Sequence, residues 1–124
     1  MDAIKKILAA EGYQTVQEMD IEDSVTIEVP EMMNLVIEKV GENRVSVAHY
    51  YTQNGDLMSD PEIVFRIDGD RWVPVRYTQH PFIEQHNEDG LDLDGFEARW
   101  NRNLVTQGFV EAARKAASTE QVSA

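Results

Sequence analysis

The side chains most able to bind or react lie close together between His49 and Asp60. This segment offers an imidazole, two phenols, two amides and two carboxylates, from His49, Tyr50, Tyr51, Gln53, Asn54, Asp56 and Asp60. If Asn54 and Gly55 form a two-residue hairpin turn, His49 lies directly opposite Asp60. A carboxylate beside an imidazole fixes its tautomer and supports base catalysis or metal ligation. The same pair also occurs as a cross-strand structural hydrogen bond, and this is the interpretation we favour.

The apolar pattern of the hairpin does not fit a simple two-residue turn. That turn leaves Ile63, Phe65 and Ile67 on the opposite face from Val45 and Val47. A shift of one residue in the pairing would bring the two apolar sets to the same face, because successive side chains of a strand point to opposite faces. We therefore predict either a three-residue loop or a β-bulge near Asp60–Pro61. Pro61 has no N–H to donate to the ladder, which favours the bulge. In the shifted register, His49 faces Pro61 rather than Asp60.

A metal site is an alternative use of the same residues. His49, Asp56 and Asp60, with His80 and His86, are side-chain types that bind Zn, Mn or Fe. No His-x-x-x-His or His-Glu-x-x-His spacing joins them. The alternative function is a small metal-dependent hydrolase that uses His49 with Asp56 or Asp60. Because that spacing is missing, we expect no cofactor and no metal.

A second candidate lies near the C-terminus, where Arg99 and Arg102 could bind an anion or the acidic loop of this chain. Phosphate-binding loops, nucleophile elbows and Ser/His/Asp signatures are missing from the sequence. We therefore expect a binding protein rather than an enzyme.

The composition is that of one acidic globular domain. The chain has 124 residues, a net charge of -12 and no cysteine. Its length predicts a single domain over residues 1–118, with residues 119–124 fraying. The lack of cysteine excludes a disulfide scaffold, a thiolate zinc site and a cysteine nucleophile. The sequence shows no signal-peptide pattern and no membrane-length apolar run, so we expect a cytoplasmic location and no membrane partner.

The acidic residues are unevenly distributed along the chain. No Lys or Arg occurs between Lys6 and Lys39, and none occurs between Arg76 and Arg99. Such a chain does not suit direct phosphate-backbone binding, which needs clustered cations. Its acidity can serve solubility alone, or it can match a basic protein partner by imitating nucleic acid. The first run contains Glu11, Glu18, Asp20, Glu22, Asp23, Glu28, Glu31 and Glu38.

The periodicity predicts an α+β fold. We expect a short helix over residues 3–11, a loop over 13–23 and then an antiparallel β-meander of about five strands. The first two strands fall at residues 24–29 and 34–40. The third and fourth are the two arms of the hairpin, which begins at residue 45 and ends at residue 67. The fifth falls at 72–77, where Pro74 predicts an edge strand or a bulge. Residues 78–93 are expected to form a long connection. A longer helix, with a capping box at Asp94–Glu97 and a bend at Gly108, packs on one face of the sheet.

The sequence resembles a known family in the same region that carries the reactive side chains. The segment Val45-Ser-Val-Ala-His-Tyr-Tyr-Thr-Gln-Asn-Gly-Asp-Leu-Met-Ser-Asp-Pro-Glu, preceded by Asn34-Leu-Val-Ile-Glu-Lys, carries the resemblance. It is similar to an uncharacterised bacterial domain found on plasmids, phages and other mobile elements. The resemblance covers residues 34–67 and continues loosely to the last helix. It implies a setting around DNA transfer or host defence, and it assigns no catalytic residue.

Together these observations predict a non-enzymatic acidic binding module of a bacterial mobile element. Its contact surface is expected at the 49–60 hairpin, with the acidic segments alongside. One version is an anti-defence protein that blocks a basic nucleic-acid-binding surface of a host enzyme. The sequence leaves the partner's identity and the oligomeric state open.

Overall fold

The computed structural model describes the backbone of residues 1–53, 56–79, 83–93 and 95–123. Side chains are described for residues 1–50, 61–79, 84–93 and 95–116. The elements occur in the order α1 (Asp2–Ala10), η1 (Val16–Glu18), β1 (Ser24–Ile27), β2 (Asn34–Gly41), β3 (Arg44–Gln53), β4 (Asp56–Asp68), β5 (Arg71–Gln79), β6 (Ile83–His86), α2 (Phe96–Thr106) and α3 (Phe109–Ser123). The predicted α+β class is confirmed.

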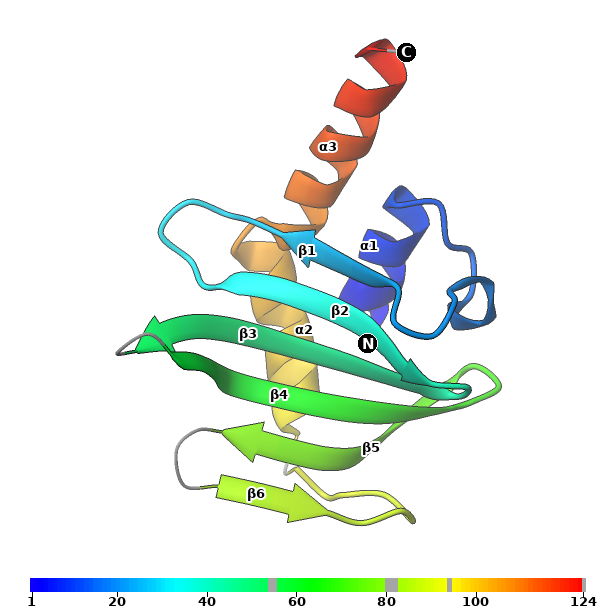
Figure 1. Cartoon of the computed structure of the whole chain (residues 1–124), viewed down its shortest axis with the longest axis vertical. Helices are drawn as coiled ribbons and strands as arrows, with labels where there is room; N and C mark the ends of the chain where they lie inside the picture. Colours follow the sequence, from blue (N-terminus) through cyan, green and yellow to red (C-terminus); the bar gives the residue numbers. More distant parts are fainter. Residues whose placement is uncertain (54–55, 80–82, 94, 124) are drawn as a thin grey trace.

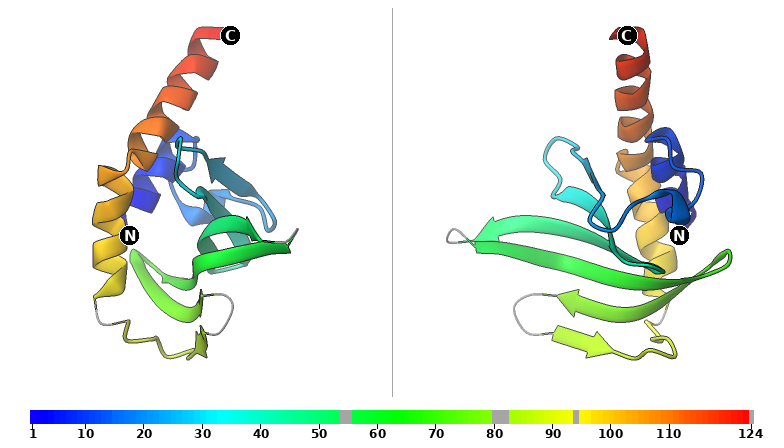
Figure 2. Two further views of the ribbon diagram at one scale, coloured as in Figure 1. Left: turned by 90° about the vertical axis from the view of Figure 1, so that its left-hand side faces the viewer. Right: turned by 45° about the vertical axis from the view of Figure 1, so that its right-hand side comes forward.

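The six strands form one antiparallel sheet in sequence order, β1-β2-β3-β4-β5-β6, and the helices cover one face of it (Figure 1; Figure 2). Alternate residues of β1 to β4 point to that face and join the apolar sides of the helices in one core. α3 projects past the β1 edge of the sheet (Figure 1). The largest fully buried side chains of this core are Phe65, Phe109, Ile4, Ile7, Met19, Leu35, Ile37, Ile63 and Leu104.

The hairpin of β3 and β4 contains the predicted bulge. Gln53 pairs with Asp56, so the connection is two residues long and the three-residue alternative is wrong. Tyr50 pairs with Ser59, but Ala48 pairs with Glu62. One residue of β3, His49, therefore lies opposite two residues of β4, Asp60 and Pro61. Beyond the bulge, Val47 pairs with Ile63 and Val45 with Phe65, so both apolar sets face the helices.

A second bulge lies at the proline of β5. Val64 pairs with Arg76 and Phe65 with Pro74, which leaves Val75 as the extra residue. The bulge that Pro74 predicted is confirmed. The edge-strand alternative is wrong, because β6 pairs with the outer side of β5. The prediction of a long connection over 78–93 is wrong over residues 83–86, where polar residues form β6 and the sequence shows little apolar alternation.

Lys39 connects the segment before β1 to the sheet. It occupies a core-facing position of β2 and is only 6% exposed. Its ammonium group donates to the carbonyl oxygens of Met19 (2.8 Å) and Val16 (3.3 Å) in and beside η1. Its backbone N–H and C=O also bond to Asp23 and Glu22. The expected loop over residues 13–23 is therefore held against the core, and no pattern in the sequence predicted this buried cation.

The helix ends depend on glycine. Gly12, at φ 98°, follows α1 in the left-handed conformation that commonly ends a helix. Gly108, at φ 92°, separates α2 from α3, so the predicted bend is a complete break between two helices. The predicted capping position is wrong, because α2 begins at Phe96 with Gly95 as its N-cap. Asp94 itself lies outside the described residues.

We expect Lys39→Met to lower the free energy of unfolding by about 2 kcal/mol, because carbonyls of the 16–19 turn lose their charged donor. Lys6→Met is the matched control, since Lys6 is exposed on α1, and it should change stability by less than about 0.5 kcal/mol. Urea denaturation of both variants measures the difference. Equal stability of the two variants would contradict a structural role for the buried ammonium group.

Gly108→Ala is expected to destabilise the fold by roughly 1–2 kcal/mol through backbone strain. A Cβ at Gly108 meets no atom within 4 Å, so packing does not contribute. Gly41→Ala serves as the control, because Gly41 is not among the residues with positive φ. If thermal unfolding shows the same small change for both variants, the left-handed conformation at Gly108 costs less than we state.

Candidate functional site

His49 is the buried centre of the predicted site. It lies on β3 opposite the bulge and is 7% exposed. Its ring packs against Trp100 of α2 and Phe109 of α3, with ring centroids 5.5 Å and 5.2 Å away. Its Nδ1 lies 3.3 Å from the carbonyl oxygen of Met33. A carbonyl only accepts, so this contact is a hydrogen bond when Nδ1 carries the proton.

A groove of about 270 Å³ opens beside His49, between the helices and the β1–β2 loop. Its apolar walls combine two exposed methionines with aromatic rings, and three polar side chains of α2 and the following turn complete it. The lining residues are Met32, Met33, His49, Pro61, Phe96, Arg99, Trp100, Asn103 and Gln107. Most of these were missed from the sequence, because α2 and the β1–β2 loop meet β3 only in the folded chain.

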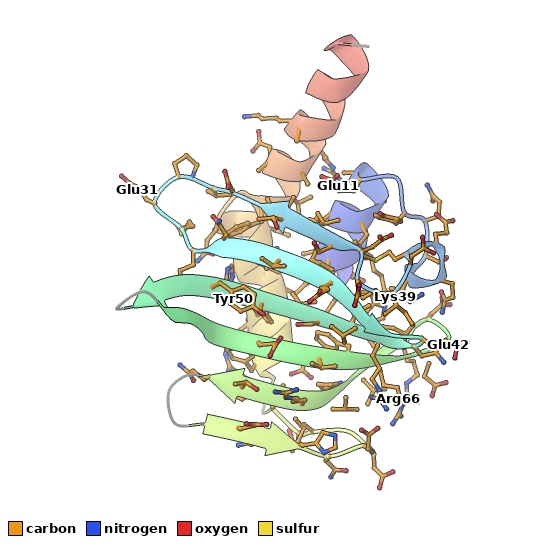
Figure 3. The ribbon with its side chains drawn as sticks, in the orientation of Figure 1. Glu11, Glu31, Lys39, Glu42, Tyr50 and Arg66 are labelled. Carbon is orange, nitrogen blue, oxygen red and sulfur yellow. The ribbon has the colours of Figure 1, made fainter. Side chains whose placement is uncertain are left out.

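A separate polar cluster lies on the sheet face that the helices leave uncovered. Glu62 accepts hydrogen bonds from Ser46 (2.6 Å) and from Tyr50 (3.3 Å). Burial, followed by the charge and hydrogen bond of Glu62, raises the pKa of Tyr50 to about 12. Tyr50 is labelled in Figure 3. As expected for one of two successive tyrosines, it lies outside the main core.

Several predicted site residues are only partly described. Tyr51, Gln53, Asp56 and Asp60 lie on β3 and β4, but their side chains are outside the described residues, and so is all of Asn54. The contact between His49 and Asp60 therefore stays a prediction.

The metal-site alternative gains no support from the side chains that the structure describes. Among these residues, no group of three His, Asp or Glu side chains could hold a metal ion. His86 contacts Glu88 at 2.9 Å on the surface, and His80 lies outside the described residues.

The two arginines of α2 do not line the same groove. Arg99 lines the His49 groove, whereas Arg102 lines a different one beside Met1 and Asp2. The hypothesis of a joint Arg99–Arg102 anion site is therefore weakened, although each arginine is exposed.

A third feature is the acidic edge, which we define as Glu11, Glu18, Asp20, Glu22, Glu28 and Glu31. All six side chains are exposed, in the segments that lead into and out of the edge strand β1. Figure 3 shows Glu11 at the end of α1 and Glu31 at the tip of the β1–β2 loop. The first cation after Lys6 is Lys39, which is buried. Between Lys6 and Lys39, the segment that carries the acidic edge therefore contains no exposed Lys or Arg.

Residues 2–110 match a family described as "Domain of unknown function (DUF6908)". The chain belongs to this family. The match covers both the His49 groove and the acidic edge, and it agrees with the resemblance to an uncharacterised family. No curated protein and no solved structure matches the chain. Within the described part of this family member, none of the helices has the length and apolar character needed to cross a membrane.

Tyr50 should make the fold lose stability in alkaline solution. In the unfolded chain Tyr50 ionises near pH 10, whereas the folded chain keeps the proton up to about pH 12. The free energy of unfolding therefore falls as pH rises through this window. Tyr50→Phe should show a smaller fall in urea denaturation at the same pH values. Parallel curves for the two proteins would contradict the raised pKa of Tyr50.

Proposed function

We propose that this member of the DUF6908 family is a non-enzymatic binding module whose acidic edge contacts a basic surface of a partner protein. The observation that carries the proposal is the burial of Lys39 beside the exposed carboxylates. If Lys39 were exposed, its charge would partly neutralise the neighbouring acids. With Lys39 enclosed and bonded to backbone carbonyls, the carboxylates of residues 11–31 present negative charge to the solvent.

Electrostatics favours a protein partner rather than a nucleic acid. The net charge of -12 repels a phosphate backbone and attracts a basic surface. Complementary charge mainly accelerates encounter and suppresses wrong partners. The affinity then depends on a smaller number of central contacts. Tyr50, half-buried on the uncovered sheet face, is one residue of the predicted hairpin surface that can supply such a contact.

We further propose a bacterial mobile element as the setting and the cytoplasm as the location. In that setting, the acidic edge covers a nucleic-acid-binding surface of a host defence enzyme. Support comes from the resemblance of residues 34–67 to domains of plasmids and phages, and from the separation of acidic and basic side chains along the chain.

The test is affinity capture from nuclease-treated bacterial lysate with three forms of the protein. The first is the wild type. The second carries Glu22→Gln, Glu28→Gln and Glu31→Gln on the acidic edge. The third carries Asp68→Asn, Asp70→Asn and Asp89→Asn, which remove the same charge from other exposed positions.

We expect the wild type and the control to retain one basic protein at low salt and to release it at about 0.5 M salt, where surface charges are screened. The acidic-edge variant should retain at least tenfold less. The captured protein should lose DNA binding when the wild type is added. Equal retention by both variants would show that the acidic edge is not the contact surface.

A further inference from the structure

The groove beside His49 differs in charge from the rest of this acidic protein. Among the described side chains, none of the nine that line it is Asp or Glu, and Arg99 is one of the nine. The other four grooves found among the described residues each contain at least one carboxylate, for example Asp70, Asp68, Asp2 and Asp92. Because 23 of 124 residues are acidic, a groove whose described lining holds an arginine and no carboxylate favours an anionic ligand over a cationic one.

The indole N–H of Trp100 is the second observation. Trp100 lines the groove and is 4% exposed, and its Nε1 has no hydrogen-bond acceptor. An indole N–H can only donate, and a buried donor without an acceptor is destabilising. Buried tryptophans usually find a partner for this group. An acceptor supplied by a ligand removes that penalty, and the ligand gains the same free energy in affinity.

The groove can adjust to admit such an acceptor. Met32 and Met33 are 42% and 37% exposed at its rim, and methionine side chains change rotamer at low cost. Asn103 and Gln107 add amide donors along the same wall of α2 and the turn after it. The two methionines provide apolar surface on the side of the β1–β2 loop, and Phe96 adds apolar surface at the start of α2. The polar groups that can donate are thus grouped on the helix side of an otherwise apolar groove.

We propose that this groove binds a small amphipathic carboxylate. The carboxylate accepts hydrogen bonds from the Trp100 indole and the amides of Asn103 and Gln107, with the charge of Arg99 nearby. The apolar body of the ligand lies against Met32, Met33 and Phe96. The volume of about 270 Å³ is at the lower end for ligand sites and limits the ligand to roughly the size of an aromatic or branched aliphatic acid. None of the six residues of the acidic edge lines this groove.

The test follows the indole N–H signals of the two tryptophans by ¹⁵N NMR during titration with phenylacetate at constant ionic strength. Trp72 is an internal control, because it packs against Phe65 and lines a different groove. We expect a saturable shift of the Trp100 signal with a dissociation constant of about 1 mM, typical of a fragment of this size. The Trp72 signal should stay in place.

Two related probes test the chemistry. Phenylacetamide has the same body without the charge, and benzylamine carries the opposite charge. Both should move the Trp100 signal at least about tenfold more weakly, because charged hydrogen bonds are the stronger ones. The proposal would be overturned if phenylacetamide shifted the Trp100 signal as much as phenylacetate does. It would also be overturned if the Trp72 signal moved as much as the Trp100 signal, or if phenylacetate gave no saturable shift at ~20 mM.

A matched pair of variants tests the position. Arg99→Gln should weaken phenylacetate binding about fivefold to tenfold, whereas Arg102→Gln, one turn further along α2 and outside the groove, should leave it unchanged. Both arginines are exposed, so both variants are expected to fold. Equal weakening by the two substitutions would show that general charge, rather than the groove, determines binding.

Discussion

The register between β3 and β4 is the constraint on which most of this structure depends. With a two-residue connection at the hairpin tip, a regular ladder would place Val45 and Val47 on one face and Ile63 and Phe65 on the other. The bulge at Asp60–Pro61 inserts one residue and brings all four onto the helix-covered face. Those two strands are the centre of the sheet, so every other strand takes its register from them. The bulge also places His49 where α2 and α3 cross.

The charge distribution follows from how the edge of the sheet is closed. β1 has four residues and would bury little by itself. The segment before it is fixed to β2 by the buried Lys39, whose ammonium group donates to the carbonyl oxygens of Met19 and Val16. One cation is thereby removed from the surface, and the neighbouring carboxylates remain exposed. The burial of Lys39 thus has two consequences. It supplies a hydrogen-bond donor to the 16–19 turn, and it removes an exposed cation from beside the acidic edge.

The acidic edge and the His49 groove are chemically opposite sites on a small protein. The acidic edge is exposed, flanks an edge strand and attracts cations within about a Debye length of the surface. The groove has no carboxylate among its described side chains, contains an unpartnered indole N–H and lies between helices and sheet. Met32 and Met33, which line the groove, belong to the β1–β2 loop, and the same loop carries Glu31. A ligand in the groove therefore contacts a loop that also belongs to the acidic edge.

Much of the local structure was determined by the amino-acid sequence alone. Alternation at Val25, Ile27, Leu35 and Ile37 predicts strands, Gly108 predicts a bend, and Pro61 and Pro74 each favour a bulge as one of two alternatives, because each effect acts within a few residues. Only the tertiary structure decided that residues 83–86 add a strand, that Lys39 is buried and that Trp100, Met33 and His49 meet. Those outcomes depend on contacts between segments far apart in the chain, and local periodicity carries no information about which polar residue is enclosed when such segments pack.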